Sequence, residues 1–142
     1  GDEAGMWGAN DPDCRKPMLW PDKKYDAETF NPNQSKHDAD EVVFDQDLFD
    51  WYKKFTSIRQ QYKSIRLGSY SSLVTDDEKK LYVFSRKLGK EEVIVIINRS
   101  NKPLLFKHPL LKKQQYKNLM TKLSVVNQIN VNAMDVVVLG NK

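Results

Sequence analysis

The hydrophobic pattern changes twice along the chain. Residues 1–44 show no regular period. Large apolar side chains then recur at intervals of three and four, and the set is Leu48, Trp51, Tyr52, Phe55, Ile58, Tyr62 and Ile65. This spacing places them on one face of an amphipathic helix. From residue 69 onward, short runs rich in β-branched and aromatic residues alternate with turn residues, which is typical of β-strands.

The helix is predicted over residues 46–67. Asp45 suits the N-cap, because its carboxylate can accept a hydrogen bond from a free N–H of the first turn. Phe44 and Phe49 have the spacing of a hydrophobic staple. Gly68 can end the helix in the left-handed conformation. We interpret the aromatic face as packing against protein rather than as a ligand-stacking surface.

Seven strand segments follow the helix, at 70–74, 81–88, 92–98, 103–107, 115–120, 124–129 and 134–139. The run Val93–Ile97 is apolar at every position, which predicts a central strand buried on both faces. Many short strands with regular turns favour an antiparallel β-sandwich. The chain is therefore predicted to be mainly β, with one long helix and an irregular N-terminal segment before the sandwich.

The first twenty residues, GDEAGMWGANDPDCRKPMLW, combine large apolar side chains with residues that break helices. Gly5, Gly8, Pro12 and Pro17 together exclude a helix. This composition indicates irregular backbone packed against something large, as in loops that form sites. Residues 21–44 are polar and rich in Asp, Asn and Pro, which predicts a connecting loop.

Composition places the chain among ordinary globular proteins, with 142 residues, 30% charged and 39% hydrophobic. Residues 1–50 hold 5 basic and 13 acidic residues, whereas residues 51–142 hold 18 and 6. Because the lysines fall mostly in turns, we interpret the basic part as a solvated surface and expect no nucleic-acid partner. No apolar run approaches the roughly 20 residues that cross a bilayer, so no membrane partner is expected.

The segments GDEAGMWG and DPDCRKPMLW closely resemble the end of the catalytic barrel in the α-amylase family of glycoside hydrolases, neopullulanase and cyclomaltodextrinase type. In that family a YGDExG segment leaves the eighth barrel strand, and a DPDxRxPMxW loop follows. The match is looser over 45–98 and only general beyond. The resemblance implies a barrel-terminal loop segment at 1–44, the last barrel helix at 45–68 and a C-terminal Greek-key β-sandwich domain at 69–142.

No residue of this chain is expected to be catalytic. A retaining glycosidase needs two carboxylates about 5–5.5 Å apart on either side of the bond. The pairs Asp2/Glu3 and Asp11/Asp13 are too close on one loop to reach opposite faces of a sugar ring. In the family, the three catalytic carboxylates precede the YGDE-like segment. The expected chain is therefore a C-terminal fragment, inactive by itself, of an enzyme that cleaves α-glucosidic bonds in starch, pullulan or maltodextrins.

Asp11 and Arg15 are the candidate substrate-binding residues. A carboxylate accepts hydrogen bonds from sugar hydroxyls, and a guanidinium donates several in a fixed fork. Trp7 and Trp20 could add apolar packing against a sugar ring. The resemblance implies that Asp11 and Arg15 hold glucose units on the donor side of the cut. The alternative is an internal ion pair that only shapes the loop.

No metal or cofactor is expected. Cys14 is the only cysteine, and His37 and His108 lack partners at a metal-ligand spacing. Asp38 and Asp40 beside His37 favour a solvated loop over a cation site. A structural calcium in the parent enzyme and the cellular compartment are left open.

The expected partner is an α-glucan oligosaccharide in the parent enzyme. Exposing the apolar helix face would be unfavourable. We therefore expect residues 1–44 to fold over that face, or two chains to form a homodimer through it. Two other functions stay open for the sandwich: a carbohydrate-binding module for α-glucans, and a structural domain that caps the barrel.

Overall fold

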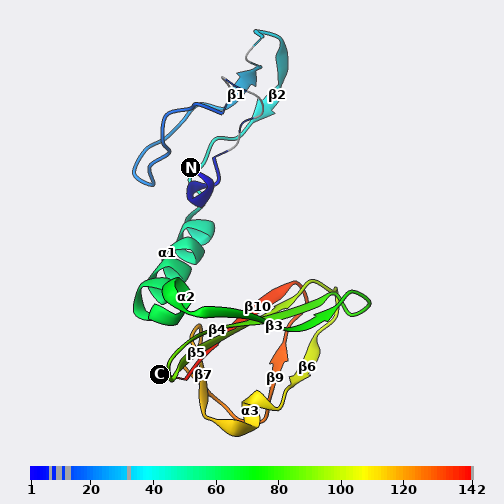
Figure 1. Cartoon of the computed structure of the whole chain (residues 1–142). Helices are drawn as coiled ribbons and strands as arrows, with labels where there is room; N and C mark the ends of the chain where they lie inside the picture. Colours follow the sequence, from blue (N-terminus) through cyan, green and yellow to red (C-terminus); the bar gives the residue numbers. More distant parts are fainter. Residues whose placement is uncertain (7, 9–10, 12–13, 32, 142) are drawn as a thin grey trace. The chain divides into compact units, whose positions relative to one another are not determined.

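A computed structural model describes residues 1–6, 8, 11, 14–31 and 33–141 of the chain. They form two compact units, residues 1–56 and residues 57–142 (Figure 1). The division falls within helix α1 (Gln46–Gln61). Each unit is described by itself below.

The N-terminal unit contains a β-hairpin where a connecting loop was predicted. Strands β1 (Glu28–Phe30) and β2 (Lys36–Asp40) pair in antiparallel fashion, with Phe30 opposite Lys36. Asn31 and Ser35 close the turn by a backbone hydrogen bond of 2.9 Å. The prediction of a loop over 21–44 is therefore wrong for this stretch. The sequence of β2, KHDAD, carries no apolar alternation, so its strand has no hydrophobic signal.

The start of helix α1 confirms the predicted cap. The Asp45 Oδ1 atom accepts a hydrogen bond of 2.9 Å from the backbone N–H of Leu48. The rings of Phe44 and Phe49 lie 5.2 Å apart between centroids, as a hydrophobic staple requires. Local sequence therefore determines where this helix begins.

The end of the helix differs from the prediction of one continuous helix over 46–67. Tyr62 has an extended backbone (φ −105°, ψ 106°), and the chain continues as the short helix α2 (Lys63–Leu67). The Glu91 carboxylate accepts a hydrogen bond of 2.6 Å from the backbone N–H of Ser64 at the start of α2. Burial raises the pKa of Tyr62, and the charge of Glu91 acts in the same direction. The break therefore depends on tertiary contacts.

Gly68 does not adopt the predicted left-handed conformation, since its φ is −77°. It is required for a different reason. A Cβ atom at this position would lie 2.5 Å from the carbonyl oxygen of Ser64 and 2.6 Å from that of Lys87. The glycine therefore permits close contact between helix α2 and strand β4.

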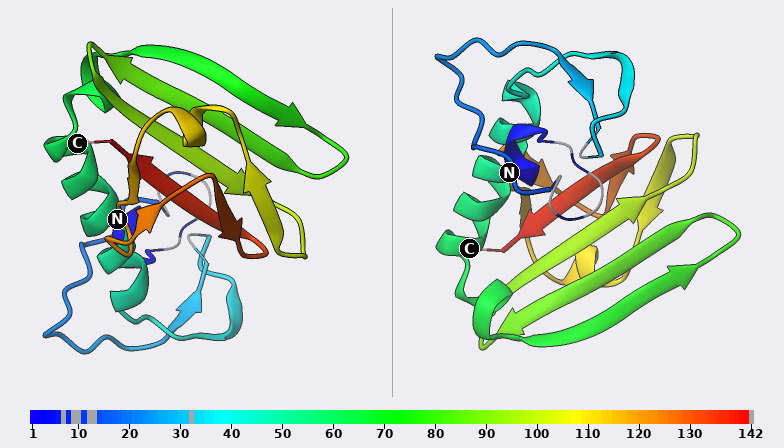
Figure 2. Two further views of the ribbon diagram at one scale, coloured as in Figure 1. Left: turned by 90° about the horizontal axis from the view of Figure 1, so that it is seen from below. Right: turned by 90° about the horizontal axis from the view of Figure 1, so that it is seen from above.

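The C-terminal unit is an antiparallel β-sandwich. One sheet has six strands in the order β3–β4–β5–β10–β7–β8, and the other pairs β6 with β9 (Figures 1 and 2). Strand β10 returns to lie beside β5 after the chain has passed through both sheets, which is a Greek-key connection. The strands are β3 (Ser69–Asp76), β4 (Leu81–Leu88), β5 (Glu91–Asn98), β6 (Leu104–Lys107), β7 (Tyr116–Asn118), β8 (Ser124–Val125), β9 (Gln128–Val131) and β10 (Asp135–Gly140).

The hydrophobic core contains Val83, Ile94, Ile96, Phe106, Leu111, Tyr116, Val125, Val131, Val137 and Leu139. Strand β5 contributes two of these residues and lies between β4 and β10. Its Val93, on the opposite face, is also fully buried. The prediction of a central strand at 93–97 is confirmed.

Two details of the predicted strands are wrong. The predicted strand at 124–129 consists of β8 and β9, which belong to different sheets. The backbone of Asn127 between them is left-handed (φ 64°), a conformation that asparagine tolerates better than most residues. A short helix, α3 (Leu110–Lys113), lies between the predicted strands at 103–107 and 115–120, where no helix was predicted.

A buried polar network joins β5, β7 and the end of the chain. Glu92 is only 4% exposed, and its Oε2 atom accepts hydrogen bonds of 2.9 Å from both the Tyr116 hydroxyl and the Gln114 amide. The Asn141 side chain accepts from the Glu92 N–H at 2.7 Å and donates to Gln114 at 3.0 Å. Burial raises the pKa of Tyr116 to about 12, and the Glu92 carboxylate acts in the same direction.

Replacing Tyr116 by phenylalanine tests this network. Tyr116→Phe should lower the free energy of unfolding at pH 7 by about 1–3 kcal/mol, because the buried Glu92 carboxylate loses a donor. Urea denaturation measures this loss. A change below the error of the measurement would show that the network does not stabilise the fold.

The same variant tests the pH dependence. The folded state holds the Tyr116 proton more tightly than the unfolded state, so its stabilisation is complete below pH 10 and is lost as the pH rises toward 12. Tyr116→Phe lacks this proton. Its free energy of unfolding should therefore fall less steeply than that of the wild type between these two values. Parallel curves would contradict the assignment.

Candidate functional site

The segment that carries the family resemblance is held against the start of helix α1. Ala4 is fully buried, and its carbonyl oxygen accepts a hydrogen bond of 3.1 Å from the Asp45 N–H. Gly5 has a φ of 71°, and a Cβ atom there would lie 2.9 Å from the Asp45 Cβ. A glycine is therefore needed at position 5 both for its backbone conformation and for close contact.

The two predicted binding residues are brought together. The Arg15 Nε atom lies 2.5 Å from the Asp11 Oδ1 atom, and the side chains are 76% and 60% exposed. The contact uses Nε, and the guanidinium carries further N–H donors on its terminal amino groups. The geometry fits both alternatives drawn from the sequence, an ion pair that shapes the loop and a polar fork for a sugar. Trp7 and Asp13 lie outside the described residues, and Trp20 is 57% exposed.

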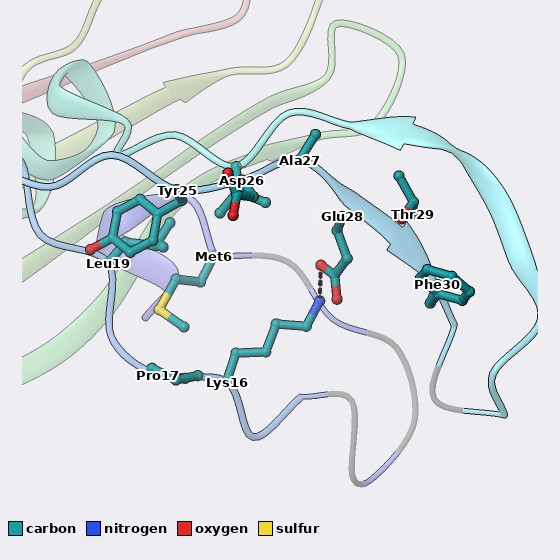
Figure 3. Close-up of a pocket in the computed structure, with 11 residues that line it drawn as sticks. Met6, Lys16, Pro17, Leu19, Tyr25, Asp26, Ala27, Glu28, Thr29 and Phe30 are labelled. Atoms are coloured by element: carbon teal, nitrogen blue, oxygen red, sulfur yellow. Dashed lines mark hydrogen bonds and ion pairs between the residues drawn. The ribbon is translucent and has the colours of Figure 1, made fainter.

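A pocket of about 540 Å³ lies in the same unit. Its walls come from the N-terminal segment and from the β1–β2 region: Met6, Lys16, Pro17, Leu19, Tyr25, Asp26, Ala27, Glu28, Thr29, Phe30 and Val42. Figure 3 shows the Lys16 ammonium reaching the Glu28 carboxylate at the pocket, where the two atoms are 2.6 Å apart. Sequence reasoning missed this pocket, because it did not predict the hairpin, whose strand β1 contributes Glu28, Thr29 and Phe30 to the lining.

The arrangement suits binding better than catalysis. The pocket offers apolar walls and an ion pair whose side chains are 22% and 27% exposed. Asp2, Glu3 and Asp11 do not line it. Its two carboxylates, Asp26 and Glu28, are two residues apart in one segment, and Glu28 is paired with Lys16. The described side chains can therefore hold a ligand through packing and hydrogen bonds.

The residues that the structure describes form neither a metal site nor a membrane-spanning helix. No group of three or more His, Cys, Asp and Glu side chains there could hold a metal ion. The His37 Nδ1 atom lies 2.6 Å from the Asp38 carbonyl oxygen and 3.4 Å from the Asp40 carboxylate, within β2 rather than in the expected loop. No described helix has the length and apolar character of a membrane span.

Part of the apolar face of helix α1 remains exposed. Trp51 and Tyr52 are 43% and 44% exposed, and the Trp51 ring stacks on Phe55 at 5.6 Å. Both rings thus remain partly exposed beside the described residues of 1–44. Pairing of two chains through this face stays a prediction.

Comparison with known proteins places the chain in a family. Residues 70–136 match the family model described as the C-terminal domain of maltogenic amylase. The chain is 37% identical over 101 residues to a cyclomaltodextrinase of Geobacillus thermopakistaniensis, covering 71% of this chain and 14% of that protein. It is 33% identical over 98 residues to neopullulanase 2 of Thermoactinomyces vulgaris, covering 69% and 14%. The chain thus spans about a seventh of the length of these relatives.

The fold is shared with solved structures. The crystal structure of α-amylase from Geobacillus thermoleovorans, complexed with acarbose, superimposes with a TM-score of 0.72 over 99% of this chain and 28% of that one, at 19% identity. This likeness confirms the β-sandwich architecture. Together with the sequence matches, it shows that the chain belongs to the α-amylase family of glycoside hydrolases, neopullulanase and cyclomaltodextrinase type, and carries its maltogenic amylase C-terminal domain.

Proposed function

We propose that this chain is the C-terminal part of a glycoside hydrolase that cleaves α-glucosidic bonds in starch, pullulan or maltodextrins, and that the chain itself is a structural and accessory part of that enzyme. The names of its relatives, cyclomaltodextrinase and neopullulanase, support the substrate class. The 14% share of their length supports a larger parent protein. The pairing of Asp11 with Arg15 supports a preformed polar fork for a glucan.

The observation that supports the structural role is that strand β5 has apolar residues on both of its faces. Ile94 and Ile96 face the core, whereas Val95 and Ile97 lie on the outer face of the sheet and are half-buried. A strand with apolar residues on both faces is expected to be covered on both sides. We infer that the catalytic barrel of the parent enzyme covers the central part of this face, along β5 and β10, and leaves the β3–β4 edge of the sheet open.

A second function, carbohydrate binding by the sandwich, is favoured by one observation. Most aromatic residues of the chain lie before residue 69, in the N-terminal segment and the helix. The structure gathers Tyr70, Tyr82 and Phe84 on the outer face of the large sheet, with ring centroids 5.6 and 5.8 Å apart along the series. Adjacent aromatic rings are a suitable surface for sugar rings.

The pure chain should not hydrolyse starch or p-nitrophenyl maltosides. Acidic residues on one loop cannot flank a glycosidic bond, as the retaining mechanism requires. Release of reducing sugar measures activity. Turnover proportional to the amount of chain, and absent from a mock purification, would refute the proposal.

Arg15→Ala in the full-length enzyme should lower kcat/KM on maltooligosaccharides by about 10- to 100-fold, the effect of losing a charged hydrogen-bonding group. Arg15→Lys keeps the charge but loses the fork, so its loss should be intermediate. Because exposed ion pairs contribute little to folding, thermal unfolding of both variants should match the wild type. Unchanged kinetics would leave the ion pair with a loop-shaping role only.

Deleting residues 69–142 from the full-length enzyme separates the structural from the accessory role. The deletion should give an insoluble or strongly destabilised protein, because the apolar surface that the sandwich covers would face water. Soluble expression and Tm are the measurements. A soluble enzyme with unchanged Tm would favour an accessory binding role instead.

A further inference from the structure

A second pocket lies at the tip of the β3–β4 hairpin. Figure 2 shows this hairpin at the edge of the six-stranded sheet. The pocket has a volume of about 410 Å³ and is lined by Thr75, Asp76, Asp77, Lys80, Leu81, Tyr82 and Arg99, which we call the hairpin pocket. Its volume falls within the range of about 300–1,000 Å³ that is usual for small-ligand sites.

Three aromatic rings extend from this pocket along the outer face of the sheet. Tyr82 is opposite Ile97 in the register, while its neighbour Val83 faces the core. Phe84 follows on the same face, 5.8 Å from the Tyr82 ring and 5.6 Å from the Tyr70 ring. The hydroxyls of Tyr70 and Tyr82 are hydrogen-bonded to each other. Tyr70, Tyr82 and Phe84 thus form a continuous aromatic row, in which Tyr70 is 51% exposed.

The charged side chains that line the hairpin pocket differ in whether they already have a hydrogen-bond or ion-pair partner. Asp76 is engaged by Lys79, whose backbone N–H donates at 2.9 Å and whose ammonium lies 2.7 Å from the carboxylate. The hydrogen bond from the Lys79 side chain lowers the pKa of Asp76. By contrast, the exposed side chains of Asp77 and Arg99 make no hydrogen bond or ion pair with any described residue.

The position of Arg99 is fixed by its backbone. Its N–H donates a hydrogen bond of 2.9 Å to the carbonyl oxygen of Lys80, which has a left-handed backbone with a φ of 52°. This contact joins the end of strand β5 to the turn of the β3–β4 hairpin. It therefore fixes the backbone from which the Arg99 side chain extends, and Arg99, Asp77 and Tyr82 all line the hairpin pocket.

These groups select a class of ligand. A free carboxylate and a free guanidinium together offer acceptors and a fork of donors, which match the hydroxyls of a neutral sugar. The carboxylate of Asp77 disfavours a phosphate or an acidic peptide at this place. The aromatic row adds flat apolar surface of the kind on which sugar rings pack.

We propose that the hairpin pocket and the aromatic row form a binding site for an α-1,4-glucan chain. In this site, Asp77 and Arg99 hydrogen-bond the hydroxyls of one glucose unit, while Tyr82 and Tyr70 pack against successive units. The choice of an α-glucan rests on the proposed function of the parent enzyme. The site binds the glucan without cleaving it.

The test is calorimetric titration of the 142-residue chain with maltoheptaose. Arg99→Ala and Tyr70→Ala should each raise Kd by at least about tenfold, and Asp77→Asn should raise it measurably. Tyr52→Ala is the matched control, because Tyr52 is a comparably exposed tyrosine (44%) on helix α1. Tyr52→Ala should leave Kd unchanged, and Arg15→Ala is titrated beside it to separate binding at the hairpin pocket from binding at the N-terminal loop. All the substituted side chains are exposed, and circular dichroism checks that each variant is folded.

Three outcomes would overturn this inference. One is the absence of heat from the wild-type chain, and another is binding that depends on Arg15 but not on Arg99. The third is that the hairpin variants weaken binding to the isolated chain but leave binding to the full-length enzyme unchanged. This result would indicate that other parts of the enzyme cover the site. None of these outcomes bears on hydrolysis by the full-length enzyme and its dependence on Arg15, so failure of this site and failure of the proposed function remain distinguishable.

Discussion

Burial of strand β5 on both faces is the constraint on which the sandwich depends. Val93, Ile94 and Ile96 are at most 1% exposed, so each must be covered from its own side. Strands β4 and β10 flank β5 and satisfy its backbone hydrogen bonds. The pair β6 and β9 covers one face, where Phe106 and Val131 join the core.

Polar groups then fix how the chain leaves this strand. The side chain of Asn98, at the end of β5, is 1% exposed and donates hydrogen bonds of 2.9 Å to the Lys102 carbonyl and 2.7 Å to the Asn132 carbonyl. Its oxygen accepts from the Ser100 N–H at 3.0 Å. One buried amide thus holds the turns that lead into β6 and into β10, because each hydrogen bond replaces one that water would otherwise supply.

The parts of the fold that could be predicted from sequence are those with local causes. The Asp45 cap, the staple of Phe44 with Phe49 and the apolar run of β5 each depend on neighbouring residues. The parts that could not be predicted depend on distant ones. Tyr62 interrupts the helix in a region where the Glu91 carboxylate binds the start of α2, and the ring of Tyr62 lies where a Cβ on Gly140 would be only 2.8 Å away.

The same distinction applies to the sites. Asp11 and Arg15 were identified as candidates because they belong to one compact motif, and the structure pairs them. Lys16 and Glu28 meet only because of a hairpin whose polar strands give no pattern. Arg99 lies far in sequence from Asp77, so a link between them required the register of the sheet.

An irregularity in the edge strand β3 makes the aromatic row possible. The pairing of β3 with β4 shifts between Ser72 and Val74, and both Leu73 and Val74 pack against the core. Without this bulge, strict alternation would place Tyr70 and Thr75 on opposite faces. With it, both lie on the outer face beside Tyr82. The bulge also interrupts an edge strand that carries no charged side chain before Asp76, which protects it from pairing with another strand. One local feature therefore both shapes the proposed binding face and protects the edge on which it lies.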